Sequence, residues 1–160
     1  HLMTSGDVHI GIISGSQDIL CHTERIAGFR SILRSYLNIS VVGTIMNNDD
    51  DEESYALTLQ LLQAHPEMNA LYFSAAGVYG GCRAVLASGR ADNMTIISND
   101  MVDTTREFIE SGLICATICQ HPYIQGYKPL SILFTYLTTG ELPSTEYHYV
   151  DVDIRIRENI

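Results

Sequence analysis

Short apolar segments alternate with longer helical segments along almost the whole chain, and this alternation limits the possible folds more than any other feature. Short strands that are each followed by a helix favour right-handed crossovers and a parallel sheet with helices on both faces. We therefore predict an α/β three-layer sandwich with a mainly parallel sheet. Strands are expected at 8–14, 39–45, 70–74, 94–98 and 115–119, and helices at 23–37, 51–64, 77–89, 102–112 and 122–140.

The last segment, 146–159, has a different pattern, because Val150, Val152, Ile154 and Ile156 alternate with mostly charged residues. Such alternation is typical of an edge strand, so it completes a Rossmann-like sheet of about six strands. The opening residues 1–6 are expected to be left over from cloning and are set aside. A chain of 160 residues favours one domain, here 7–160.

The composition excludes several functions for this segment. The formal net charge is −10, with 9 Lys and Arg against 19 Asp and Glu, and basic residues never cluster, so we expect no direct nucleic-acid binding. No run of 18 apolar residues predicts a membrane span, and no basic start followed by an apolar stretch predicts a signal peptide. The four cysteines form no CxxC pair and are expected to be reduced and buried, as in cytoplasmic proteins.

The sequence contains no motif typical of an enzyme. It has no phosphate-binding loop with a lysine, no GxSxG elbow and no HExxH pair. Asp100 and His121 could be drawn as an acid–base pair, but no nucleophile or second carboxylate accompanies them. Cys115 and Cys119 are interpreted as packing residues rather than a metal or redox site. We therefore predict a protein that is not an enzyme and uses no cofactor and no metal.

Polar side chains gather where the predicted strands end. In open α/β sheets, ligands bind beyond the carboxyl ends of the strands, so these side chains are the candidates for ligand contact. They are mostly uncharged, with one carboxylate near the middle of the sheet. The candidates are Ser14, Ser74, Asn99, Asp100 and Gln120.

Four segments occur in an order and spacing that resemble one known family. They are RIAGFRSIL (25–33), IISND (96–100), ATICQHPYIQGY (116–127) and DIRIREN (153–159). Together they resemble the carboxyl-terminal part of the sugar-responsive regulators of the LacI/GalR family, whose sensor has a type I periplasmic binding protein-like fold. The chain departs from that family in having small residues at 74–81 in place of an Asn-Asp pair, and Asn99 in place of an apolar residue.

The resemblance implies a role for three residues. Arg25 corresponds to an arginine that reaches into the ligand cleft, Asp100 to a carboxylate that accepts from two sugar hydroxyls, and Gln120 to a glutamine at the crossover between lobes. Other readings stay open: Arg25 as a solvated helix residue, and Asp100 and Gln120 as helix caps.

The resemblance also implies a function and an organisation. It implies a cytoplasmic, dimeric transcription repressor that senses a carbohydrate effector and binds DNA only through an amino-terminal helix-turn-helix absent from this chain. Residues 8–120 and 150–160 would form one lobe, and helix 122–140 would belong to the missing first lobe. We expect that helix to pack on the same lobe or to be exchanged within a homodimer. The alternatives are the solute-binding protein of a sugar ABC uptake system and a flavodoxin-like module.

Overall fold

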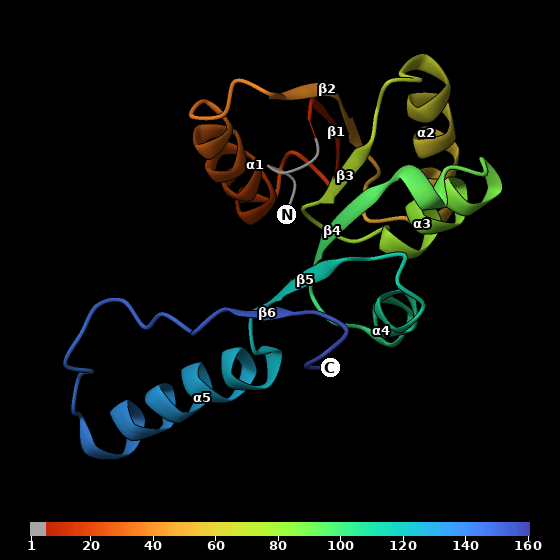
Figure 1. The fold of residues 1–160 in the computed structure, drawn as a ribbon. Coiled ribbons are helices and arrows are strands. Elements are labelled where there is room, and N and C mark those ends of the chain that lie inside the picture. The colour runs from red at the N-terminus through yellow and green to blue at the C-terminus, as the bar shows by residue number, and fades with distance from the viewer. Residues whose placement is uncertain (1–5) are drawn as a thin grey trace.

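The computed structural model describes residues 6–160, so the proposed cloning remnant lies, except for Gly6, outside the described residues. Figure 1 shows one twisted sheet with the strand order β2-β1-β3-β4-β5-β6. The first five strands are parallel, and β6 runs antiparallel to β5. The predicted α/β fold with a mainly parallel six-stranded sheet is therefore confirmed.

Each predicted strand and helix is present; β1 and α2 have the predicted bounds, and the ends of the others are shifted. The strands are β1 (Val8–Ser14), β2 (Ile39–Met46), β3 (Ala70–Phe73), β4 (Thr95–Asn99), β5 (Ala116–Cys119) and β6 (Asp153–Arg155). The helices are α1 (Leu20–Leu33), α2 (Asp51–Ala64), α3 (Val78–Ala87), α4 (Asp103–Glu110) and α5 (Pro122–Thr139), with a short 3-10 turn at Ala91–Asn93.

The core has one part on each face of the sheet. On one face Ile10 and Tyr72 are buried under α1, with the ring of Phe29 stacked on Tyr72 at a centroid distance of 4.4 Å. On the other face Leu71 and Phe73 pack under α2 and α3. Neighbouring residues of β3 thus contribute to opposite faces, as the strand period of two requires. Burial on both faces explains why β1 and β3 are apolar almost throughout.

Helix α5 extends away from the sheet and contains no buried residue. Together with the segment 141–150 it lines a mostly apolar groove of about 700 Å³, which we call the α5 groove. The expectation that this helix packs on its own lobe is therefore wrong, because the helix turns away from the sheet at His121. Whether it belongs to a first lobe or is exchanged between copies stays a prediction.

The expectation of buried cysteines is correct only for Cys82. Cys21 and Cys115 are exposed, and Cys119 is half-buried. Cys21 lies on the solvent side of α1, and Cys115 directly precedes β5. The lack of a CxxC pair indicates reduced cysteines, but it does not determine whether a cysteine is buried. Within residues 6–160, no helix combines the length and apolar character needed to cross a membrane.

Candidate ligand-binding site

Three of the predicted site residues meet at the carboxyl edge of the sheet. Nη2 of Arg25 lies 3.5 Å from Oδ2 of Asp100, and Nε2 of Gln120 donates to Oδ1 of the same carboxylate at 3.4 Å. These residues come from α1, from the end of β4 and from the end of β5. Parallel strands end at the same edge, which explains why residues far apart in sequence converge here.

Arg25 is held by the backbone as well as by the carboxylate. Its Nη1 donates to the carbonyl oxygen of Ser74 at 2.6 Å, and only 20% of its side chain is exposed. A simple solvated arginine does not fit this environment. The guanidinium has further donors, and the Asp100 side chain is 53% exposed, so both groups can still bind a hydroxyl-rich molecule.

The capping alternatives for the other two residues are not realised. The N-cap of α4 is Val102, so Asp100 does not cap that helix. The N-cap of α5 is His121, and no side chain caps its first turn. Asp100 instead has a left-handed backbone with a φ of 67°, and its carbonyl oxygen accepts from the Thr117 hydroxyl. Asp tolerates this conformation better than most residues, which suits a carboxylate turned outward at a strand end.

Ser14, Ser74 and Asn99 lie beneath this cluster. The Ser74 hydroxyl donates to the Ser14 hydroxyl at 2.8 Å, and both residues are fully buried. Nδ2 of Asn99 donates to the Phe73 carbonyl oxygen at 2.9 Å and to the Tyr72 hydroxyl at 3.1 Å. Their predicted ligand contacts stay predictions, but in this structure their hydrogen bonds link the ends of β1, β3 and β4, where the Ser74 carbonyl oxygen accepts from Arg25 and where Asp100 follows β4.

The loop after β2 contributes polar residues that were not among the predicted site residues. Asp50 does cap α2, since its side chain accepts from the Glu53 amide at 2.7 Å. Asp49, however, accepts from the Ala76 amide at 3.1 Å, and Asn47 donates to the Ala76 carbonyl oxygen at 2.9 Å. These bonds fasten the loop after β2 to the loop after β3. The only sequence signal was a run of Asn and Asp, which favours tight turns.

The site contains no arrangement typical of catalysis or metal binding. Among the described residues, no group of three or more His, Cys, Asp or Glu side chains could hold a metal ion. Nε2 of His121 lies 3.2 Å from Asp153 rather than beside Asp100. The cluster places one guanidinium, one carboxylate and one amide around a half-exposed edge, and these groups can donate and accept hydrogen bonds.

Comparison with protein families shows which family this chain matches. The model of the periplasmic binding protein domain matches residues 2–142, which is most of the chain. The chain belongs to this family. A periplasmic binding protein domain of type I has two lobes, and the sheet described above corresponds to one of them.

Individual relatives are named as sugar-binding proteins. The domain is 28% identical to the xylose/arabinose-binding protein XylF of Sulfolobus acidocaldarius, over 74% of this chain and 30% of the relative. It is 26% identical to the D-ribose/D-allose-binding protein of Pseudomonas aeruginosa, over 86% of this chain and 43% of the relative. The solved glucose-galactose binding protein GanP of Geobacillus stearothermophilus superposes with a TM-score of 0.90 at 24% identity, over 98% of this chain and 56% of GanP.

The periplasmic binding protein domain described here therefore spans less than half the length of the two curated relatives and about half of GanP. The periplasmic binding protein family has the fold that the sequence resemblance implied for this chain. The three relatives reported above are named as sugar-binding proteins, and none of these names is that of a transcription regulator.

Proposed function

We propose that the chain is the carboxyl-terminal lobe of a sugar-binding protein that delivers its ligand to an ABC uptake transporter. The observation that carries the proposal is the convergence of Arg25, Asp100 and Gln120 at the carboxyl edge of the sheet. A carboxylate beside a guanidinium pairs well with adjacent sugar hydroxyls, because the carboxylate accepts and the guanidinium donates charge-assisted hydrogen bonds. The sugar-binding relatives support the same ligand class.

The transport function replaces the transcription repressor as the favoured reading, because the named relatives bind sugars and none is described as a regulator. Under this proposal the first lobe supplies the other wall of a cleft, and α5 belongs to that lobe. The full-length protein would then act outside the cytoplasm as a monomer. A helix-turn-helix upstream of residue 6, together with DNA binding by the full-length protein, would restore the repressor reading.

The test is calorimetric titration of the full-length protein with D-xylose, D-ribose, D-allose, D-glucose and D-galactose. We expect at least one sugar to bind, and Asp100→Asn to weaken that sugar by about 10- to 100-fold, the loss typical of a charged hydrogen bond. Asparagine tolerates the left-handed backbone at this position, so the substitution changes charge with little strain.

Two arginines on α1 provide a matched comparison. Arg25→Lys should weaken sugar binding strongly, because a lysine cannot bridge the Ser74 carbonyl oxygen and Asp100 with the same planar geometry. Arg30→Lys should leave binding unchanged, because Arg30 donates to the Thr44 hydroxyl and does not take part in the Arg25–Asp100–Gln120 cluster. If Arg25→Lys and Arg30→Lys both bind like the wild type, the site is assigned wrongly.

A further inference from the structure

A second hollow opens beside the proposed sugar site, between α3 and α4. It has a volume of about 300 Å³, within the range of small-molecule sites, and its lining includes Asn99 and Asp100. Neither Arg25 nor Gln120 lines it. Figure 1 shows α1 on the opposite face of the sheet from α3 and α4, so the hollow extends from Asp100 away from Arg25. We call this hollow the α3–α4 pocket.

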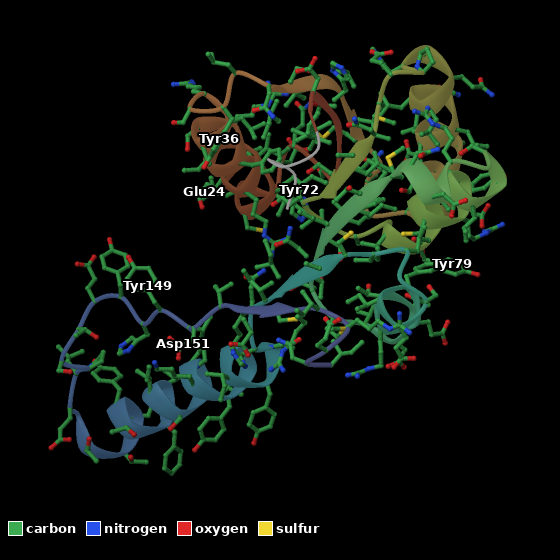
Figure 2. The ribbon with its side chains drawn as sticks, viewed as in Figure 1. Glu24, Tyr36, Tyr72, Tyr79, Tyr149 and Asp151 are labelled. Carbon is green, nitrogen blue, oxygen red and sulfur yellow. The ribbon has the colours of Figure 1, made fainter. Side chains whose placement is uncertain are left out.

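The lining of the α3–α4 pocket is mixed in a way that suits a carbohydrate. Ala75, Ala76 and Val102 provide small apolar surfaces, and Tyr79 adds an aromatic side chain. Figure 2 shows Tyr79 beside α4. Its ring is held in a near-parallel stack with Phe108, at a centroid distance of 6.0 Å. Such surfaces match the C–H faces of a sugar ring.

The pocket also offers unused hydrogen-bonding groups. Thr105 lines the pocket and is 1% exposed, yet its hydroxyl has no partner among the described residues. Buried hydroxyls are normally hydrogen-bonded, so this hydroxyl could gain a bond from an occupant of the neighbouring pocket. Moreover, no side chain caps the first turn of α4, whose first intrahelical bond runs from the Arg106 amide to Val102. The amides before Arg106 are therefore free donors at the pocket wall.

The charges that line the pocket limit which kind of molecule can bind there. Asp51 and Asp100 both line the pocket, and no Lys or Arg does, so an anionic group such as a phosphate is disfavoured. Nearby, Oδ1 of Asp51 accepts from the Gly80 amide at 3.1 Å, which leaves its second oxygen as an acceptor. An uncharged molecule that carries hydrogen-bond donors and acceptors on an apolar ring fits this lining best.

We propose that the α3–α4 pocket is an accessory subsite for a second sugar unit, so that the protein binds a disaccharide or longer glycoside. Asp100 would contact the first unit from one side, and the second unit would extend over α3 and α4 towards Thr105. The inference rests on the proposed sugar-binding function, and it specifies that the ligand has at least two sugar units.

The test compares matched sugars on the full-length protein by calorimetric titration. D-glucose and D-galactose are titrated against maltose, cellobiose and lactose, and D-xylose against xylobiose. We expect one disaccharide to bind about tenfold or more tightly than the monosaccharide it contains. Val102→Trp fills the pocket and should remove this gain while changing monosaccharide affinity less than about twofold.

A second variant tests the unpartnered hydroxyl without filling the pocket. Thr105→Val keeps the shape of the side chain and removes a buried hydroxyl, so it is expected to fold. It should weaken the disaccharide about three- to tenfold and leave the monosaccharide unchanged.

The possible outcomes separate the two proposals. If monosaccharides bind and no disaccharide binds more tightly, the accessory subsite is overturned and the sugar-binding function stands. The same holds if the gain survives Val102→Trp. If no sugar of either size binds, both proposals fail.

Discussion

Within residues 6–160, four residues other than glycine have a positive φ, and all of them lie at the carboxyl edge of the sheet. They are Asn48, Asp49, Asp100 and His121, with φ between 49° and 67°. After glycine, Asn, Asp and His enter this region at least cost. The same residues therefore provide both the turn in the backbone and the polar side chain at these loops. Turns that carry site residues therefore depend on residue type as well as on hydrogen bonds.

The cysteines give a prediction at this scale. Burial raises the pKa of the Cys82 thiol, and burial also raises the pKa of Cys119 less strongly. A higher pKa means less thiolate at a given pH and slower reaction. In a DTNB titration at about pH 8 we expect the exposed Cys21 and Cys115 to react first, Cys119 more slowly, and Cys82 only after unfolding.

The Cys21→Ser variant is the control for this assignment and should remove one fast equivalent of reagent. Rapid labelling of all four thiols in the folded state would contradict the buried position of Cys82.

At the scale of elements, α2 and α3 approach each other closely because α3 carries glycine where they meet. A Cβ at Gly80 would overlap the backbone carbonyl of Asp51, the first residue of α2. The Gly80 amide also donates to the Asp51 side chain at 3.1 Å. Since a backbone carbonyl at a helix start cannot move aside easily, glycine at this position sets the distance between the two helices.

We therefore expect Gly80→Ala to lower the free energy of unfolding by about 1–3 kcal/mol, the usual cost of overpacking, despite the better helix propensity of alanine. Gly28→Ala is the matched substitution, because Gly28 is also helical but a Cβ there meets nothing within 4 Å. It should raise the free energy of unfolding by about 0.5–1 kcal/mol. Urea unfolding of both variants measures the difference; equal effects would contradict the close approach.

The order of elements could be predicted from sequence because apolar runs and helix periods are local signals. Their ends were less predictable. The strand expected at 146–159 is reduced to Asp153–Arg155, because its partner β5 covers only Ala116–Cys119 and alternation alone does not create a partner. Likewise, Asp100 and Gln120 could be found from sequence because they follow predicted strands, and Arg25 on α1 could be found from the family resemblance. The link from Asp49 to Ala76 and the α3–α4 pocket could not, since they depend on contacts between segments distant in sequence.

At the scale of the whole molecule, the α5 groove is a large and mostly apolar exposed feature. Leu133 is 51% exposed and Leu142 is 77% exposed, and both line the groove. Figure 2 shows α5 and the following segment, with Tyr149 and Asp151, standing apart from the sheet. Apolar surface of this extent normally lies against another surface.

We expect the chain on its own to associate with further copies and to elute above its monomer mass of 17.8 kDa in size-exclusion chromatography with light scattering. The double variant Leu133→Ser, Leu142→Ser should shift it towards the monomer. Ile32→Ser, which removes an exposed apolar side chain on α1, should leave the association unchanged. A wild-type chain that stays monomeric at high concentration would show that the groove needs no cover.

The pairing of β5 with β6 means that the chain leaves the sheet and returns to it at one place. Cys119 of β5 pairs with Asp153 of β6, so the two ends of the intervening segment 120–152 already lie side by side. A tight turn of two to five residues is enough to join neighbouring antiparallel strands. Deleting 120–152 and inserting such a turn should thus leave a β-hairpin at the edge of the sheet and a minimal, self-contained domain. Circular dichroism and light scattering would show whether this shortened chain is folded and monomeric.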